Sequence, residues 1–186
     1  MRIITGNLKG KKILFPNDKS TRPLRDMVKE SIFNLIENSN KYSLKVEQSN
    51  ILDLFAGSGS FGFECISRGA KKVVFFENYY KTLKILKRNI LDLKLEDKCD
   101  VFEKDCFNFF QSTQISNMKY NIIFIDPPYK EKKINILLER ILDEKILANK
   151  GIIIIHRHRK DDLIISEKFK ILDTRIYGIS KIMIGN

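Results

Sequence analysis

Short apolar runs alternate with longer amphipathic segments between residue 50 and about residue 156 of the chain. The apolar runs have the length and composition of buried strands, while the segments between them carry apolar residues at helical spacing along one side. The predicted strands are residues 51–55, 72–77, 100–104, 121–125 and 152–156. The predicted helices are residues 61–68, 79–91, 106–110 and 133–146. This alternation predicts an α/β protein in which helices cover both faces of a parallel sheet.

The pattern changes towards the C-terminus. Residues 169–177 and 180–184 have the pattern of two strands joined by a tight turn at Gly178. They predict an antiparallel pair at the end of the sheet, which then has seven strands. We expect two parts in the chain, a small N-terminal extension of residues 1–49 and a main domain of residues 50–186.

The predicted extension consists of a ribbon, a helix and a linker. Residues 2–16 alternate weakly between apolar and polar positions, as in a hairpin or ribbon. Ser20 or Thr21 is the expected N-cap of the following helix, with Pro23 in its first turn. The apolar face of this helix is expected to contain Met27, Val28, Ser31, Ile32, Leu35 and Ile36. Residues 39–49 are polar, as expected for a linker.

The composition is that of a folded protein, because 43% of its 186 residues are hydrophobic and 31% are charged. The apolar runs are too short to span a bilayer, and the N-terminus lacks the apolar region of a signal peptide. We therefore expect a cytoplasmic protein without a membrane partner. The formal net charge of +11 favours a polyanionic partner such as nucleic acid, although lysine-rich surfaces also occur in proteins that bind none.

The cysteines and histidines do not have the pattern of a metal site. Cys65, Cys99 and Cys106 are odd in number and form no Cys-x-x-Cys pair, which argues against zinc and against a disulfide framework. His156 and His158 have no cluster of carboxylates or cysteines beside them in the sequence. We expect both histidines to lie at a basic strand end that faces solvent or RNA.

A glycine-rich turn follows the first predicted strand of the main domain. Gly57, Gly59 and Gly62 lie between this strand and a helix, where glycine lets the backbone approach a ligand closely. Glu77 follows Gly57 by 20 residues and ends the second strand, the position from which an acid binds a ribose diol. The spacing fits NAD as well as S-adenosylmethionine, and it also occurs in turns that bind nothing.

Two further acids favour S-adenosylmethionine over a dinucleotide. Asp53 lies near the end of the first strand, where a carboxylate suits an ammonium or sulfonium group better than a pyrophosphate. Asp105 follows the third strand and can accept a hydrogen bond from an adenine amine. Asp105 is equally suited to cap the short helix after it.

The fourth predicted strand ends in Asp126-Pro127-Pro128-Tyr129. The prolines restrict the backbone, so that the Asp126 carboxylate and the Pro127 carbonyl can point at one place. Two acceptors that converge suit an exocyclic amine, and Tyr129 offers a flat face on which a base can stack. Ligands of open parallel sheets bind outside the carboxyl ends of the strands where the strand order reverses. We therefore expect this motif to face the same crevice as Gly57 and Glu77.

These motifs resemble those of class I Rossmann-like methyltransferases. The N-terminal stretches "RIITGNLKGKKILFP" and "TRPLRDMVKESIFNLI" further resemble the RsmD family, the guanine-966 N2-methyltransferases of 16S ribosomal RNA. The resemblance covers almost the whole chain and implies S-adenosylmethionine as cofactor and ribosomal RNA, within a small-subunit particle, as partner. It also implies a monomer without metal.

The resemblance implies three groups of site residues. The catalytic group is Asp126, Pro127 and Tyr129. The cofactor-binding group is Asp53, Phe55, Gly57, Ser58, Gly59, Glu77, Asn78, Asp105 and Cys106. The RNA-binding group is Arg2, Lys9, Lys11, Lys12, Arg22, Arg25 and Lys29. The chain departs from the family pattern at Leu24, where threonine is common, and at His156, where an acid is common.

Three alternatives stay open at this point. A DNA or RNA methyltransferase that acts on adenine or cytosine shares the glycine turn and the Asp-Pro-Pro-Tyr motif, but usually carries an added target-recognition segment. An NAD-dependent oxidoreductase would need a substrate domain and an acid–base residue, and the sequence shows neither. A non-catalytic RNA-binding assembly protein would have no need to keep Asp126, Pro127 and Glu77 together.

Overall fold

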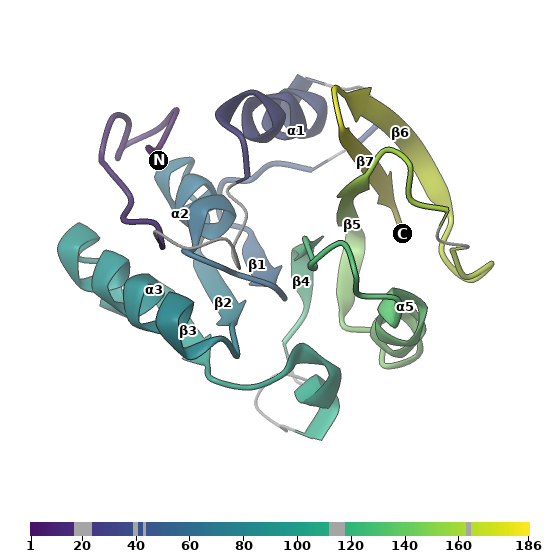
Figure 1. Cartoon of the computed structure of the whole chain (residues 1–186). Helices are drawn as coiled ribbons and strands as arrows, with labels where there is room; N and C mark the ends of the chain where they lie inside the picture. The colour runs from purple at the N-terminus through teal and green to yellow at the C-terminus, as the bar shows by residue number, and fades with distance from the viewer. Residues whose placement is uncertain (17–23, 39–40, 43, 112–117, 163–164) are drawn as a thin grey trace.

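A seven-stranded sheet runs through the middle of the computed structural model, which describes residues 1–16, 24–38, 41–42, 44–111, 118–162 and 165–186 (Figure 1). The strands are β1 (Asn50–Asp53), β2 (Lys72–Phe76), β3 (Cys99–Phe102), β4 (Tyr120–Ile125), β5 (Leu147–His158), β6 (Ile171–Tyr177) and β7 (Ser180–Gly185). Their order is β3-β2-β1-β4-β5-β7-β6. The strands from β3 to β5 are parallel, while β7 is antiparallel to both β5 and β6. The predicted Rossmann-like sheet with an antiparallel C-terminal pair is confirmed.

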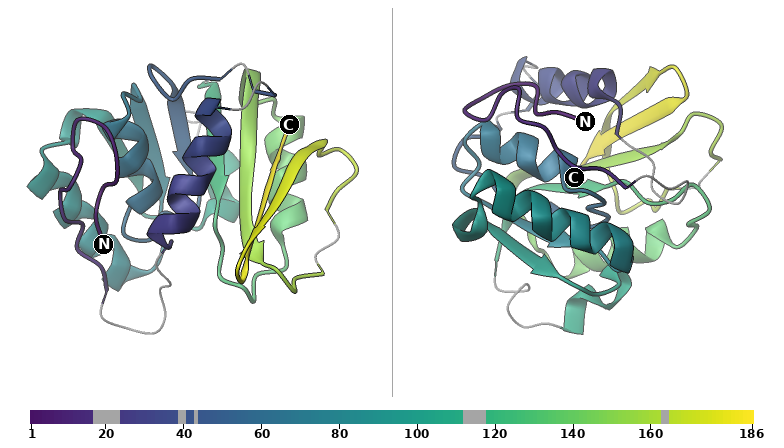
Figure 2. Two further views of the ribbon diagram at one scale, coloured as in Figure 1. Left: turned by 90° about the horizontal axis from the view of Figure 1, so that it is seen from above. Right: turned by 60° about the vertical axis from the view of Figure 1, so that its left-hand side comes forward.

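Helices cover both faces of this sheet, as the sequence predicts (Figure 2). One face packs against α1 (Asp26–Asn38), α2 (Ser60–Ser67) and α3 (Tyr80–Leu93). The other face packs against α5 (Ile134–Asp143) and the short 3-10 helix η2 (Cys106–Gln111). A second 3-10 helix, η1 (Glu96–Lys98), precedes β3. The carboxyl ends of β1 and β4 are left side by side between these layers.

Strand β5 and helix α5 differ most from their predicted bounds. The strand spans Leu147–His158 instead of residues 152–156, because its first residues pair with Tyr120 across a register shift and Lys150 there adopts a positive φ of 61°. The helix spans Ile134–Asp143 instead of residues 133–146, and Lys145 beyond it has a positive φ of 52°. The strand is also longer at its C-terminal end, where Arg157 and His158 pair with β7.

The N-terminal residues form the predicted ribbon. Its two arms meet in an antiparallel bridge between Arg2 and Lys12, and the N–H of Ile3 donates to the Lys11 carbonyl at 3.0 Å. The division at residue 49 stays a prediction, but one hydrophobic cluster contains Ile3 from the ribbon as well as Ile51 from β1. The ribbon is therefore packed into the same core as the sheet.

Helix α1 buries a face that overlaps the predicted one but is rotated from it, and the prediction is confirmed for Val28, Ile32 and Ile36. It begins at Asp26 and buries Val28, Lys29, Ile32, Phe33 and Ile36. Met27, predicted for the apolar face, is 59% exposed, so the apolar face is rotated towards Lys29 and Phe33. The predicted caps Ser20 and Thr21 lie outside the described residues.

A buried lysine joins α1, α2 and the ribbon. The ammonium group of Lys29 is fully buried, donates to the Arg2 carbonyl at 2.9 Å and to Ser60 Oγ at 3.1 Å, and lies 3.6 Å from Glu64 Oε2. Glu64 also accepts the N–H groups of Ile4 and Thr5 at 2.8 and 2.9 Å. Burial lowers the pKa of Lys29, and the nearby Glu64 and Asp26 carboxylates oppose that shift. The network ties the ribbon to the first turn of α2.

We expect Lys29→Met to lower the free energy of unfolding by about 3 kcal/mol, because Glu64 loses a buried partner and keeps only Arg68 as a counterion. Chemical denaturation monitored by circular dichroism measures this change. The control is Lys87→Met on α3, since Lys87 and its partner Glu103 are exposed and such a pair contributes less than about 1 kcal/mol. Equal effects of the two substitutions would contradict the structural role of Lys29.

Candidate active site

A cavity of about 910 Å³ lies at the carboxyl ends of β1, β2 and β4. The residues predicted for the cofactor and for catalysis that line this cavity are Asp53, Phe55, Gly57, Ser58, Glu77, Asn78, Asp105, Cys106, Asp126, Pro127 and Tyr129. Its apolar wall includes Phe61 and Phe124, whose rings stack with centroids 3.9 Å apart. The fold therefore brings the glycine turn and the Asp-Pro-Pro-Tyr motif to one hollow.

The glycine turn and Glu77 are bonded directly to each other. Gly57 adopts a positive φ of 56°, and its N–H donates to Glu77 Oε2 at 2.8 Å. Glu77 Oε1 accepts the N–H of Tyr79 at 2.7 Å. Burial raises the pKa of Glu77, while these backbone N–H groups oppose the shift. The carboxylate thus joins the ends of β1 and β2 at the wall of the cavity.

The other two glycines of the turn serve the packing of α2. Gly59 does not line the cavity, and a Cβ at its position would lie 2.4 Å from the Phe63 ring and 2.6 Å from Leu86. A Cβ at Gly62 would lie 2.3 Å from the Phe75 ring. The spacing of the glycines therefore reflects close helix–strand contact as well as access for a ligand.

Asp53 lies at the bottom of the cavity with only 1% of its surface exposed. Neither of its carboxylate oxygens has a hydrogen-bond partner of normal geometry in the described part of the chain. Burial raises the pKa of Asp53 well above its ordinary value, and the carboxylates of Asp126 and Glu77 raise it further. The N–H groups of Gly62 and Phe55 act in the opposite direction. Three largely buried acids around one hollow favour a ligand with positive charge.

Asp105 and Cys106 border the cavity on the side of β3. Asp105 Oδ1 accepts the N–H of Phe107 at 3.0 Å, which confirms the expected capping of η2 and leaves its cofactor role a prediction. Cys106 is buried, and burial raises the pKa of its thiol. The three cysteines are all free and buried.

The residues of the Asp-Pro-Pro-Tyr motif contact the end of β5. The Asp126 side chain is 14% exposed, and its Oδ1 lies 2.8 Å from Nδ1 of His156. The prediction of an exposed strand end is wrong for His156, which is 2% exposed and also lies 2.9 Å from Ser180 Oγ. Ser180 belongs to β7, which pairs with β5 here and places Ile182 opposite His156.

Sequence reasoning missed Arg157 and Asn89. Arg157 is 1% exposed and donates hydrogen bonds to the Pro128 and Tyr129 carbonyls at 3.2 and 3.0 Å. Asn89 of α3 is 1% exposed and donates to the carbonyls of Ser58 and Leu14, both at 3.0 Å. A charged residue inside the apolar strand that follows the motif was a usable signal for Arg157, whereas no local pattern marks Asn89.

The N-terminal part of the chain also contributes to the cavity. Met1, Phe15 and Leu24 line it, although none was predicted as a site residue. Leu24, where the chain departs from the family pattern, is 6% exposed. The apolar contact of these residues with the hollow explains why an aliphatic side chain suits this position.

Most of the predicted RNA-binding residues lie on the surface. Those exposed are Arg2, Lys9, Lys11, Lys12 and Arg25. The prediction is wrong for Lys29, whose ammonium group is buried against Glu64 and cannot reach a phosphate. Arg22 lies outside the described residues. Four of the exposed residues belong to the ribbon, and Arg25 lies directly before α1.

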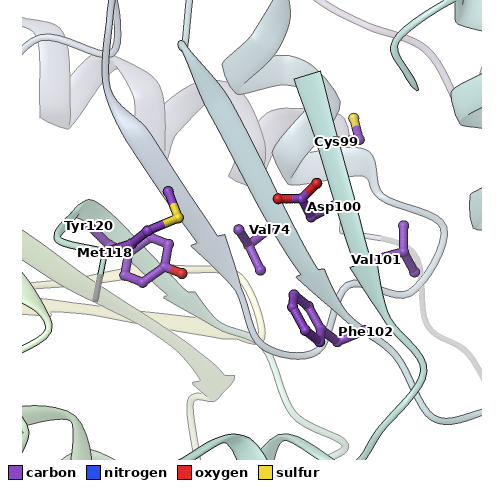
Figure 3. Close-up of a pocket in the computed structure, with 7 residues that line it drawn as sticks. All are labelled: Val74, Cys99, Asp100, Val101, Phe102, Met118 and Tyr120. Carbon is purple, nitrogen blue, oxygen red and sulfur yellow. The ribbon is translucent and has the colours of Figure 1, made fainter. Parts of the chain in front are cut away.

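A second cavity, of about 530 Å³, runs along β3 and reaches Tyr120 and Met118 (Figure 3). The Tyr120 hydroxyl points towards Val74 in this hollow. None of the predicted site residues line it. In the described ranges, no group of three or more acids, histidines or cysteines is arranged to hold a metal ion. Every helix that the structure describes is too short or too polar to cross a bilayer.

Comparison with known proteins identifies the family. A family model described as "Conserved hypothetical protein 95" matches residues 1–186. Two relatives named ribosomal RNA small subunit methyltransferase D, from Buchnera aphidicola subsp. Acyrthosiphon pisum and Haemophilus influenzae, are 32% and 31% identical to the chain. The matches cover 94% and 96% of this chain and 86% and 90% of the relatives. The chain belongs to the RsmD family.

Solved structures show the same fold over almost the full length. The structure of HI0767 from Haemophilus influenzae has a TM-score of 0.77 at 29% identity and covers 99% of this chain and 96% of that chain. The structure of yhhF from Escherichia coli has a TM-score of 0.83 at 24% identity, with 100% and 96% covered. The N-terminal ribbon and α1 are therefore part of the fold that this RsmD family member shares with both structures.

We expect Asp53→Asn to stabilise the ligand-free protein more at pH 8 than at pH 5. Because the native pKa of Asp53 is raised, the folded state binds more protons than the unfolded state, and Asp53 lowers stability as pH rises through the interval between the two pKa values. Thermal unfolding at pH 8 should give a Tm higher by at least about 2–4 °C, the shift expected per 1 kcal/mol for a chain of this size. The exposed Asp97→Asn variant is the control for loss of a charge. A Tm difference independent of pH would contradict the buried, uncompensated state of Asp53.

Proposed function

We propose that the protein transfers a methyl group from S-adenosylmethionine to the exocyclic N2 amine of a guanine in 16S ribosomal RNA, at the position that corresponds to guanine 966. Membership of the RsmD family supports ribosomal RNA as the substrate and S-adenosylmethionine as the cofactor. The single observation that carries the chemistry is the placement of Asp126, Glu77 and Asp53 in one cavity. The proposal is most specific in naming N2 of guanine as the target atom.

The residues of the cavity fit S-adenosylmethionine, which supplies an activated methyl group on a sulfonium centre. Burial raises the pKa of Asp53 and of Glu77, and a positive charge on the ligand beside them would favour their ionised forms. Glu77 would hold the ribose and Asp105 the adenine, and Gly57 and Ser58, which line the same cavity, would contact the amino-acid part. The same acids repel a pyrophosphate, which disfavours NAD.

Asp126 and Pro127 would receive the target amine. A guanine amine is a weak nucleophile because its lone pair is delocalised into the ring, and two fixed acceptors orient its two N–H groups. Arg157 engages the carbonyls of Pro128 and Tyr129 and not that of Pro127. Tyr129 lines the same cavity and offers a flat face to the base. The amine would lose one proton on methylation. The Asp126 carboxylate, as the acceptor of one of its N–H groups, would receive this proton, and the cofactor would leave as the neutral thioether.

The exposed basic residues of the ribbon, together with Arg25 just before α1, would bind the RNA backbone. Arg2, Lys9, Lys11, Lys12 and Arg25 lie on the surface of a chain with a net charge of +11. The target base has to leave its stack to reach Asp126 inside the cavity. We propose a small-subunit particle in the cytoplasm as the substrate and a monomer as the active form.

Mapping the methylated nucleoside tests the proposal. Small-subunit RNA from cells with and without the protein is digested and analysed by mass spectrometry, and purified protein is added back with labelled S-adenosylmethionine. The expected product is N2-methylguanosine at the 966 position, present only with the protein. A methylated adenine or cytosine would refute the guanine assignment, and labelling of duplex DNA alone would refute the ribosomal one.

We expect Asp126→Ala to lower methyl transfer by at least about 10²-fold, because the amine loses one of its two positioned acceptors. Cofactor affinity measured by calorimetry should change little, since Asp53, Glu77 and Asp105 are kept. The control is Asp97→Ala on η1, which is exposed and does not line the cavity. Activity of Asp126→Ala equal to that of the control would remove Asp126 from the reaction.

A further inference from the structure

The end of strand β5 lies beside the Asp-Pro-Pro-Tyr motif. The two parallel strands are in register with Ile155 opposite Ile125, where β4 ends, but β5 continues to His158. Residues 156–158 therefore run along residues 126–129 beyond the last residue of β4. Three consecutive side chains of β5 contact three different parts of the motif.

The first of these side chains, His156, holds the Asp126 carboxylate. Its Nδ1 lies 2.8 Å from Asp126 Oδ1, and its Nε2 lies 2.9 Å from Ser180 Oγ of β7. An ionised carboxylate can only accept hydrogen bonds, so Nδ1 carries the hydrogen and donates it to Asp126. Because both ring nitrogens are engaged and the ring is 2% exposed, its orientation is determined by its surroundings.

The second side chain, Arg157, holds the backbone of the motif. Its guanidinium donates to the carbonyls of Pro128, Tyr129 and Glu131 at 3.2, 3.0 and 3.0 Å. It also pairs with Asp161, four residues further along. The planar guanidinium provides several donors in fixed directions, which a lysine cannot reproduce.

The third side chain, His158, contacts the aromatic ring of the motif. Its ring meets the Tyr129 ring edge-on, with centroids 5.0 Å apart. Its Nδ1 accepts the N–H of Lys160 at 3.1 Å, so the hydrogen of its neutral form is on Nε2. The two histidines of the chain are thus expected in opposite tautomers.

Asp126 needs such support because it lies near other acids. Its carboxylate acts on the buried Asp53 together with Glu77, and like charges in a poorly hydrated cavity repel each other. An unrestrained Asp126 side chain would turn towards solvent, away from the place where an amine would have to bind. The hydrogen bond from His156 offsets this repulsion and acts on one oxygen of the carboxylate.

We propose that His156 and Arg157 are the positioning residues of this site: His156 aims the Asp126 carboxylate into the cavity, with its ring held in orientation by Ser180, and Arg157 fixes the backbone of residues 128–131. This inference rests on the proposed function, in which Asp126 orients the target amine. It concerns residues that act through Asp126 and do not themselves contact the substrate.

The tautomers of the two histidines test the proposal without any substrate. Long-range ¹H–¹⁵N NMR spectra at about pH 8, above the range in which histidine usually titrates, distinguish hydrogen on Nδ1 from hydrogen on Nε2. We expect the Nδ1 hydrogen for His156 and the Nε2 hydrogen for His158, with Asp126→Ala changing only the His156 pattern. The proposal is overturned if the His156 ring carries no hydrogen on Nδ1, or if its NMR pattern is unchanged in Asp126→Ala.

A matched pair of substitutions tests the same contact in catalysis. In His156→Asn the side-chain NH₂ takes the place of Nδ1, whereas in His156→Gln it takes the place of Nε2. We expect kcat to fall by at least about tenfold in His156→Gln and to stay within about threefold in His156→Asn, with cofactor affinity and Tm similar in the two. Equal kcat values for the two variants overturn the positioning role. An inactive wild type would instead refute the proposed function and leave the NMR result to decide this inference.

Hydrogen exchange tests the part played by Arg157. The Glu131 N–H donates to the Pro128 carbonyl at 2.9 Å, so its exchange rate reports on the backbone that Arg157 holds. Arg157→Lys keeps the charge and loses the planar set of donors, and we expect Glu131 to exchange at least about tenfold faster. An unchanged rate in a folded variant would remove Arg157 from the proposal.

Discussion

The parallel pairing of β1 with β4 is the constraint on which the site depends. Asp53 pairs with Phe124 in this register, so the two chain segments that leave these strands begin side by side. One segment is the glycine turn and the other begins with Asp126. A shift of the register by one residue would exchange the faces of β4 and move Phe124 out of the layer that contains Phe61. The hydrophobic core therefore determines the distance between the acids of the cavity.

The same site combines two environments that work against each other. Apolar residues such as Phe61 and Phe124 line the hollow beside the carboxyl groups of Asp53, Glu77 and Asp126. Asp53 destabilises the ligand-free protein at neutral pH because of its raised pKa. A positively charged ligand can remove this destabilisation. The free energy gained in this way adds to the binding free energy of the ligand.

Much of the fold and part of the site could be predicted from the sequence. Periodicity gave the parallel strands and the C-terminal pair, because each buried strand is a short apolar run with a clear end. Motif spacing identified Gly57, Glu77 and Asp126, which the fold brings to one cavity. The burial of Lys29 and of His156 was not predicted, because polar side chains are usually exposed. Their burial depends on partners far away in the chain, Glu64 for Lys29 and Ser180 for His156. Asn89 could not be found for the same reason, because its partners Leu14 and Ser58 lie 75 and 31 residues away.

Asn89 and Lys29 connect the N-terminal ribbon to the glycine turn. The Asn89 side chain hydrogen-bonds to Leu14 and Ser58, and the Lys29 side chain hydrogen-bonds to Arg2 and Ser60. Each of these buried side chains therefore contacts both the ribbon and the segment of the glycine turn. A ligand that immobilises one segment also restricts the other. The second segment then loses less conformational entropy when it binds a ligand of its own. If the ribbon binds nucleic acid and the turn binds a small molecule, as proposed, thermodynamic reciprocity requires each ligand to change the affinity for the other by the same factor.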